Sequence, residues 1–266
     1  MNLVKCPNPF RDLSFYRGSI SSLADELGQA TSLVTVATPN PEQIVLAKRE
    51  PTFLKLLTQF DYLLPDGVGL VWASRLLGSR GKMQPIPERI PGVELASELI
   101  DRSLALEEKV LIIGGWQYHH HFLITKQDKY QVVDCVEDCD SKQGQTVHWT
   151  KGYGDASLPT QAEDSQLEDV LSRLKPSLVL VALGAPKQEK WIHDHLQLLE
   201  KNQIKVVMTV GGAIDMLIGR IIRAPGWVRS MGLEWFWRLV QEPWRWKRQL
   251  KLVEFVGMVG REYLGN

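Results

Sequence analysis

The sequence is poor in cysteine, has no excess of either charge and contains no long apolar run. Three cysteines in 266 residues form an odd set without a disulfide framework, which is typical of a reducing compartment. The chain contains 31 Lys and Arg residues and 31 Asp and Glu residues, so its formal net charge is zero. Any charge bias is therefore confined to part of the chain. The first residues contain no apolar signal-peptide core, and no uncharged apolar run approaches the roughly 18 residues that cross a bilayer. We therefore expect a cytoplasmic protein with no membrane-spanning helix.

Two common nucleotide-binding motifs are also missing. The chain contains neither G-x-G-x-x-G nor G-x-x-x-x-G-K-[ST], so a dinucleotide fingerprint and a P-loop are both excluded. The first absence disfavours a nucleotide-dependent oxidoreductase. Any phosphate binding must then use another kind of site.

Short apolar runs alternate with segments of helical spacing along the chain. Short, wholly apolar strands between helices are typical of a parallel sheet that is covered on both faces. The expected strands are 33–37, 62–64, 110–113, 178–183 and 205–210, with one more at 131–136 inside the polar region 117–162. Helices are expected over 42–57, interrupted at Pro51, and over 68–77. We therefore predict an α/β fold with a Rossmann-like parallel sheet and helices on both faces.

In such folds ligands bind beyond the carboxyl ends of the strands, where polar residues gather in this chain. Asp66 lies in a Pro-Asp-Gly triplet after the second run. That triplet is first of all a turn signal, but a carboxylate at a strand end can also point into a ligand crevice and act as a general base. Thr38 and Asn40 follow the first run, where they either hydrogen-bond a sugar or phosphate or simply form a rigid Thr-Pro-Asn-Pro loop.

Two later strand ends carry glycine and an amide. The segment Gly184–Trp191 places Gly and Pro before a helix whose first turn holds Gln188 and Glu189. The N–H groups of a helix N-terminus bind anions, so Gln188 is a candidate substrate contact. The alternative is that Glu189 simply complements the helix dipole. Gly211 ends the last expected strand and is a further candidate at the same edge of the sheet.

The chain offers only weak metal motifs. Asp138 and Asp140 form an Asp-x-Asp pair, which many sugar transferases use to hold a metal on a nucleotide diphosphate, but such pairs are common in acidic loops. The consecutive histidines His119–His121 diverge on a helix and on a strand alike, which suits a shared metal poorly. Cys135 and Cys139 lack a second cysteine pair. We expect no metal site and no cofactor.

The segment from Gly219 onward differs in charge from the rest of the chain. It contains nine Lys or Arg residues against four Asp or Glu. Trp together with Arg or Lys on one helix suits a segment that lies in a membrane interface beside phosphates. Five of the nine tryptophans lie there: Trp227, Trp235, Trp237, Trp244 and Trp246. We divide the chain into an α/β catalytic domain, 1–218, and a helical appendage, 219–266.

A second interpretation of this segment is a pair of helices docked on the core, with solvated arginines. The two interpretations differ in what truncation does. A lipid-facing lid that starts near Gly219 can be removed to leave a folded, soluble core. A docked helix cannot, because its removal exposes a large apolar face.

Five sequence blocks together resemble the WecG/TagA/CpsF family, glycosyltransferase family 26. In chain order they are LPDGVGLVW, PERIPGVEL, LVALGAPKQEKW, VGGAIDMLIGR and RAPGWVRSMGLEWFWRLVQEP. The resemblance is collinear from about Thr35 to Arg248. The chain departs from the family between Gly115 and Gly152, where the usual Pro-Gly before the second strand is missing and the loop is enlarged, which bears on the donor's identity more than on the reaction type.

The resemblance implies an inverting, metal-independent transferase. Such an enzyme moves N-acetylmannosamine, its uronic acid or a glucose from a UDP-sugar to a lipid-diphosphate-linked sugar at the cytoplasmic membrane. The family's catalytic base falls on Asp66. Its other active-site positions fall on Thr38, Asn40, Arg89 and Gln188, and its tail arginines on Arg238, Arg245 and Arg248, with the spacing of seven and three kept.

These expectations define the partners. They are a UDP-sugar donor, a polyprenyl-diphosphate-linked sugar acceptor and an anionic membrane surface on the inner face of the cell membrane. Nucleic acid is not expected, and a homo-oligomer is left open. The phosphates need cations and the polyprenol needs an apolar surface, and the tail supplies both. The rival is a non-enzymatic membrane- or RNA-binding module, which would need the tail but would give the polar strand ends no purpose.

Overall fold

A computed structural model describes residues 8–115, 131–135 and 146–265 of the chain. The chain divides into two compact units. Residues 1–17, 37–91 and 223–266 form one of them, here named the tail unit. Residues 18–36 and 92–222 form the other, here named the sheet unit because it holds most of the strands.

The seven strands form one parallel sheet in the order β2-β1-β7-β6-β3-β5-β4. Its strands are β1 (Val34–Ala37), β2 (Tyr62–Leu63), β3 (Val110–Gly114), β4 (Gln131–Asp134), β5 (Thr146–Thr150), β6 (Leu178–Ala182) and β7 (Val206–Thr209). The central strands β3, β6 and β7 are buried almost throughout and consist mainly of Val, Leu and Ile. Strands of this kind need cover on both faces, because neither face tolerates water.

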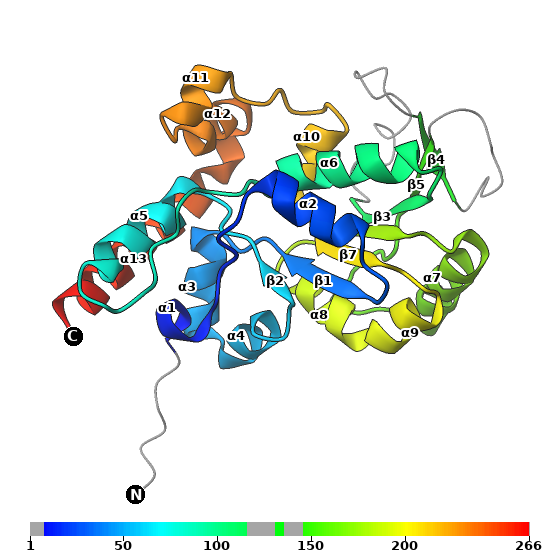
Figure 1. Ribbon diagram of the computed structural model, residues 1–266, viewed down its shortest axis with the longest axis horizontal. Coiled ribbons are helices and arrows are strands. Elements are labelled where there is room, and N and C mark those ends of the chain that lie inside the picture. Colours follow the sequence, from blue (N-terminus) through cyan, green and yellow to red (C-terminus); the bar gives the residue numbers. More distant parts are fainter. Residues whose placement is uncertain (1–7, 116–130, 136–145, 266) are drawn as a thin grey trace, which may run out of the picture. The chain divides into compact units, whose positions relative to one another are not determined.

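Helices supply that cover within the sheet unit. They are α2 (Ile20–Gly28), α6 (Gly92–Ala105), α7 (Gln161–Leu174), α8 (Lys187–Asp194), α9 (Leu196–Lys201) and α10 (Ile214–Leu217), with the 3-10 turn η2 (Gly211–Ala213). Figure 1 shows α2 and α6 on one side of the strands and α7, α8 and α9 on the other. The predicted Rossmann-like sheet with helices on both faces is therefore confirmed.

The strand predictions are confirmed with bounds that differ by at most two residues, and one strand was missed. The polar region 117–162 holds β5 as well as the expected β4. β5 lies between β3 and β4, so its His148 and Thr150 are buried although they are polar. A strand whose buried positions include polar side chains does not show the apolar run on which the prediction depended.

The tail unit consists of helices around the short strand β2. They are α1 (Pro9–Asp12), α3 (Pro41–Arg49), α4 (Pro51–Leu57), α5 (Val68–Gly78), α11 (Gly226–Ser230), α12 (Glu234–Gln241) and α13 (Trp246–Leu264), with the 3-10 turn η3 (Pro243–Arg245). The expected interruption at Pro51 is confirmed, because Glu50 is extended and Pro51 starts a new helix.

The tail unit has its own apolar core, and α13 is part of it. Phe255, Met258 and Val259 of α13 are buried among apolar side chains of α3, α4 and α5. The opposite side of the same helix is open, since the side chains of Leu250 and Val253 are 60% and 71% exposed. For α13, the interpretation as a docked helix therefore holds.

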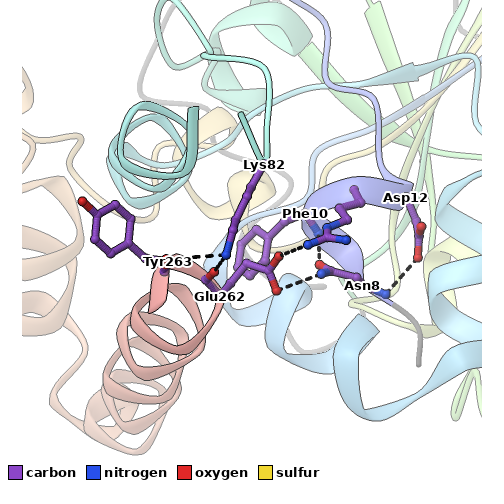
Figure 2. A network of polar contacts seen from close by, with 7 residues as sticks. Asn8, Phe10, Asp12, Lys82, Glu262 and Tyr263 are labelled. Atoms are coloured by element: carbon purple, nitrogen blue, oxygen red, sulfur yellow. Dashed lines mark hydrogen bonds and ion pairs between the residues drawn. The ribbon is translucent and has the colours of Figure 1, made fainter. Parts of the chain in front are cut away.

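Polar contacts fix the C-terminal end of α13 within the same unit. Figure 2 shows Asn8 and the start of α1 beside this end of the helix. The Asn8 amide and the Arg11 guanidinium both donate to the carboxylate of Glu262, each at 2.9 Å. From the loop after α5, Lys82 donates to the backbone carbonyl oxygens of Glu262 and Tyr263. These contacts hold together segments that lie up to 254 residues apart in the chain.

The predicted domain division lies at residue 219. In the structure, residues 223–266 group with residues 37–91 in one compact unit. Within the tail unit, the apolar face of α13 packs on α3 and α5. A separate function for residues 219–266 stays a prediction.

Candidate active site

Asp66 and the loop Thr38–Asn40 lie side by side in the tail unit. The N–H of Leu64 donates to the carbonyl oxygen of Ala37 at 2.8 Å, and the N–H of Asp66 donates to that of Pro39 at 3.1 Å. These two bonds align the segment that follows β2 with the segment that follows β1. The two segments that carry the polar residues predicted at strand ends therefore lie side by side.

Two glycines allow this close approach. Gly67 has a φ of 111°, a conformation that L side chains rarely adopt, and it precedes the first residue of α5. A Cβ atom at Gly69 would lie 2.9 Å from a side-chain carbon of Pro41, so only glycine lets the start of α5 reach the start of α3. Asp66 consequently lies where two helices begin.

Asn40 has a structural role in addition to its predicted one. Its side-chain oxygen accepts a hydrogen bond from the N–H of Gln43, and the side chain of Gln43 accepts one from the N–H of Asn40. This capping box starts α3 and fixes the Asn40 side chain. Because the cap uses the oxygen, the amide hydrogens of Asn40 are the groups that suit a ligand's acceptor atoms.

Arg89 flanks the same turn from the other side and is joined to the tail. The N–H of Ile90, its neighbour, donates to the carbonyl oxygen of Pro65 at 3.0 Å. The Arg89 guanidinium donates to Glu234, the first residue of α12, at 2.8 Å. Arg223 reaches the other oxygen of that carboxylate at 3.3 Å. Glu234 thus links a predicted site arginine to the C-terminal segment.

Two of the predicted tail arginines share one buried carboxylate. Arg238 and Arg245 donate to the same oxygen of Glu242 at 2.9 and 2.6 Å. The residue Glu242 is only 4% exposed. Burial alone raises the pKa of the Glu242 carboxyl, but the hydrogen bonds from Arg238 and Arg245 outweigh it, and the pKa lies below its ordinary value. Glu242 is therefore ionised at neutral pH.

The third predicted arginine, Arg248, lies against the start of α3. Its guanidinium is 3.5 Å from the carboxylate of Glu42, which follows Asn40 by two residues. Burial raises the pKa of Glu42, while the charges of Lys251, Arg245 and Arg238 act to lower it. Together with the Arg248–Glu42 contact, these couplings indicate that the tail cations lie near the first turn of α3.

The cation cluster keeps a positive excess. It comprises Arg238, Arg245, Arg248 and Lys251 against the carboxylates of Glu42 and Glu242. Two of these arginine side chains are about one-sixth exposed, and that of Arg248 is half exposed. Partly buried cations in excess beside a helix N-terminus suit a multiply charged anion such as a diphosphate.

Gln188 and Gly211 meet in the sheet unit. Gln188 is buried, and its side-chain oxygen accepts from the N–H of Gly184 at 3.2 Å. Its amide nitrogen donates to Glu189 at 3.0 Å. A Cβ atom at Gly211 would lie 3.3 Å from the Gln188 oxygen, so the glycine leaves room for this side chain. Glu189 is completely buried beside Gln188, so complementing the helix dipole is not its sole role.

The weak metal motifs cannot be placed. Asp138, Asp140, Cys139 and the histidines 119–121 lie outside the described residues. Within the described part of the chain, no group of three or more His, Cys, Asp or Glu side chains is arranged to hold a metal ion.

The tail unit also presents several exposed aromatic side chains. Their exposed fractions lie between 44% and 66% for Trp227, Trp235, Phe236, Trp244 and Trp246. They belong to α11, α12, η3 and the start of α13, the same segment that carries the arginines. None of the described helices is both long enough and apolar enough to cross a membrane.

Sequence reasoning did not identify the carboxylates that bind the site arginines. Glu42 was identified only as the start of an expected helix, and Glu234 and Glu242 only as two of the four acidic residues of the tail. For Glu242 a signal was present, because it follows Arg238 by four residues and precedes Arg245 by three, the spacings at which helical side chains meet. For Glu234, which pairs with Arg89 across 145 positions, no local signal exists.

Comparison with known proteins gives a consistent result. A model of the family described as "Glycosyl transferase WecG/TagA/CpsF family" matches residues 8–266. A protein of Bacillus subtilis (strain 168) is 30% identical over 227 residues, which cover 85% of this chain and 79% of that protein. A protein of Bacillus spizizenii is 29% identical over 256 residues, 94% of this chain and 90% of the relative. Both are named N-acetylglucosaminyldiphosphoundecaprenol N-acetyl-beta-D-mannosaminyltransferase.

Proposed function

This chain belongs to the WecG/TagA/CpsF family of glycosyl transferases, and from that premise we propose that it moves a sugar from a UDP-sugar to a polyprenyl-diphosphate-linked sugar. The transferred sugar is a hexose or N-acetylhexosamine, of the N-acetylmannosamine type, which is the sugar in the names of the relatives. The observation that carries the proposal is the position of Asp66. It lies between the Thr38–Asn40 loop and the Arg89 segment, in the unit that also contains the tail cations.

In this proposal Asp66 is the general base. Its carboxylate takes the proton from the acceptor hydroxyl, whose oxygen then attacks the anomeric carbon of the donor as the bond from that carbon to UDP breaks. A single displacement from the face opposite UDP inverts the anomeric centre. Thr38, Asn40 and Arg89 flank the base and would orient the sugar and its phosphates.

The tail cations are the proposed site for the acceptor's diphosphate. Arg238, Arg245 and Arg248 carry guanidinium groups, which bind phosphate oxygens in a bidentate manner. The cluster keeps more positive than negative charge, so an added diphosphate is attracted rather than repelled. Gln188 and Gly211 of the sheet unit are proposed substrate contacts.

The exposed aromatic side chains support a peripheral position at the inner face of the cell membrane. Tryptophan side chains prefer the interface between lipid and water, and neighbouring Lys and Arg side chains favour anionic headgroups. Trp227, Trp235, Trp244 and Trp246 are all substantially exposed on the segment that carries the cations. A surface of this kind would bring Arg238, Arg245 and Arg248, the proposed acceptor clamp, to a polyprenol chain that stays in the bilayer.

A UDP-release assay tests the proposal. We expect UDP release from one or more UDP-sugars, of which UDP-N-acetylmannosamine is the first to test, only when a short-chain polyprenyl-diphosphate sugar is also present. The rate should be unchanged by EDTA, because we expect no metal site. Absence of any acceptor-dependent release would contradict the proposed function. A strict requirement for Mn²⁺ or Mg²⁺ would instead assign a metal-binding role to Asp138 and Asp140.

Charge reversal at Arg248 tests the acceptor clamp. We expect Arg248→Glu to weaken transfer by roughly tenfold or more, because a repulsive charge replaces a phosphate contact. The melting temperature should hardly change, since the side chain is half exposed and exposed pairs contribute only about 0–1 kcal/mol. Adding Arg245→Glu is less informative, because it sets a second carboxylate against buried Glu242 and lowers stability as well.

The matched control is Arg49→Glu. Arg49 is also an exposed arginine of the tail unit that pairs with a carboxylate, but its partner is Glu254 on α13. Acceptor KM and binding to anionic vesicles should respond to Arg248→Glu and not to Arg49→Glu. Equal effects of the two variants would mean that general charge, rather than a defined clamp, governs acceptor use.

The alternative function is a non-enzymatic membrane- or RNA-binding module. Such a module needs the arginines and tryptophans but not the alignment of Asp66 with Thr38 and Asn40. Thermal shift separates the two, because UDP should stabilise a transferase whereas short RNA should not.

A further inference from the structure

Glu242 is the most deeply buried of the carboxylates that contact the predicted tail arginines. It follows the last residue of α12 and precedes the 3-10 turn η3, so it stands between the two arginines in the chain as well as in space. One of its oxygens accepts from Nε of Arg238 and from an Nη of Arg245. The carboxylate therefore joins the end of one helix to the turn that starts the next.

This arrangement fixes the direction of two long side chains. A guanidinium has five N–H donors in a rigid plane, and each of these bonds takes one. A planar guanidinium presents its donors in a rigid fork, so fixing one N–H fixes the direction of the whole group. Without the carboxylate, the two cations would repel each other and each side chain would regain rotameric freedom.

The arginines that Glu242 binds also lie near a carboxylate beside the site. Arg238 and Arg245 both couple electrostatically to Glu42, in the first turn of the helix that Asn40 caps. Glu242 itself is almost completely shielded from solvent and is not placed to contact a substrate. Its contribution to the reaction would therefore pass through the two arginines.

We propose that Glu242 is a positioning residue, which orients Arg238 and Arg245 to receive the diphosphate of the lipid-linked acceptor. This inference rests on the proposed function, because it takes the tail arginines to be the acceptor clamp. It assigns a role to a residue type that would otherwise oppose anion binding. The Glu242 carboxylate lowers the net positive charge of the cation cluster by one. It also holds two guanidinium groups in one geometry.

Steady-state kinetics of Glu242→Gln test the proposal in the full-length chain. The amide keeps the shape but loses the charge that both arginines bind. We expect KM for a short-chain polyprenyl-diphosphate sugar to rise about ten- to a hundredfold, a factor typical of losing a hydrogen bond to a charged group. KM for the UDP-sugar should stay unchanged. Inorganic pyrophosphate should also inhibit Glu242→Gln more weakly than the native protein, by a factor similar to the rise in acceptor KM.

The matched control is Glu254→Gln. Glu254 pairs with Arg49 on the outside of α3 and α13, so the same chemical change there should leave both KM values alone. Glu242→Asp keeps the negative charge but shortens the side chain by one methylene, which moves the carboxylate away from the arginines. Its acceptor KM should lie between those of the native protein and Glu242→Gln. If Glu242→Gln does not fold, the Asp variant decides: a native acceptor KM overturns the proposal.

The outcomes separate this inference from the proposed function. If Arg238→Ala and Arg245→Ala leave the acceptor KM unchanged, the clamp itself is wrong. If those variants raise it and Glu242→Gln does not, only the positioning role of Glu242 is overturned. A variant that raises donor and acceptor KM equally, together with a lower melting temperature, would show that Glu242 serves the fold alone.

Discussion

Asp66→Asn should reduce sugar transfer by roughly 10²-fold or more, because the amide keeps the shape of the side chain and removes the base. The turn should survive, since the backbone N–H of Asp66 still donates to Pro39 and Gly67 still supplies the positive φ. UDP affinity should therefore stay close to that of the native protein. The measurement is acceptor-dependent UDP release, with UDP affinity followed by thermal shift.

Asp61→Asn is the matched control for this prediction. Asp61 is an exposed aspartate just before β2, five positions from Asp66, and the same change there should leave transfer intact. Near-normal turnover of Asp66→Asn would leave Asp66 with the role of a turn residue. A loss of UDP affinity as large as the loss of rate would point instead to a distorted donor site.

The parts of the fold that follow from local pattern were predictable. β1, β3, β6 and β7 are short apolar runs that end at Gly, Pro or Thr, and such runs are buried on both faces of a parallel sheet. That topology places strand ends at a common edge, which is why Asp66 and Thr38 could be predicted as neighbours from the sequence. β5 could not, because two of its buried side chains are polar.

The features that could not be predicted from the sequence depend on interactions between distant segments of the chain. Glu234 pairs with Arg89 and Glu262 pairs with Arg11 over separations of 145 and 251 residues, for which no spacing rule exists. The role of α13 was ambiguous for a related reason. Its sequence places Phe255, Met258 and Val259 on one side and Leu250 and Val253 on the other, so it has apolar residues on both. Only the packing partners on α3 and α5 identify the buried side.

Removal of residues 246–266 should therefore destabilise the tail unit rather than release a folded core. The truncation deletes Phe255, Met258 and Val259 from the apolar core. Burial of each such side chain contributes about 1.5–3 kcal/mol, so the three together contribute roughly 5–9 kcal/mol. A whole domain is typically stable by about 5–15 kcal/mol, so we expect a truncated protein that aggregates or melts far below the native one.

A pair of single substitutions on α13 tests this without removing the arginines. Phe255→Ala should lower the free energy of unfolding by about 3–5 kcal/mol, because it empties a buried position beside Gly69 and Phe10. Val253→Ala, two residues away on the same helix, should change it by less than about 0.5 kcal/mol, because Val253 is 71% exposed. Denaturant unfolding of the full-length variants provides both values. If Phe255→Ala is as stable as Val253→Ala and the truncated protein stays soluble and folded, α13 is a removable lid, and the loss of transfer on truncation would then report acceptor binding alone.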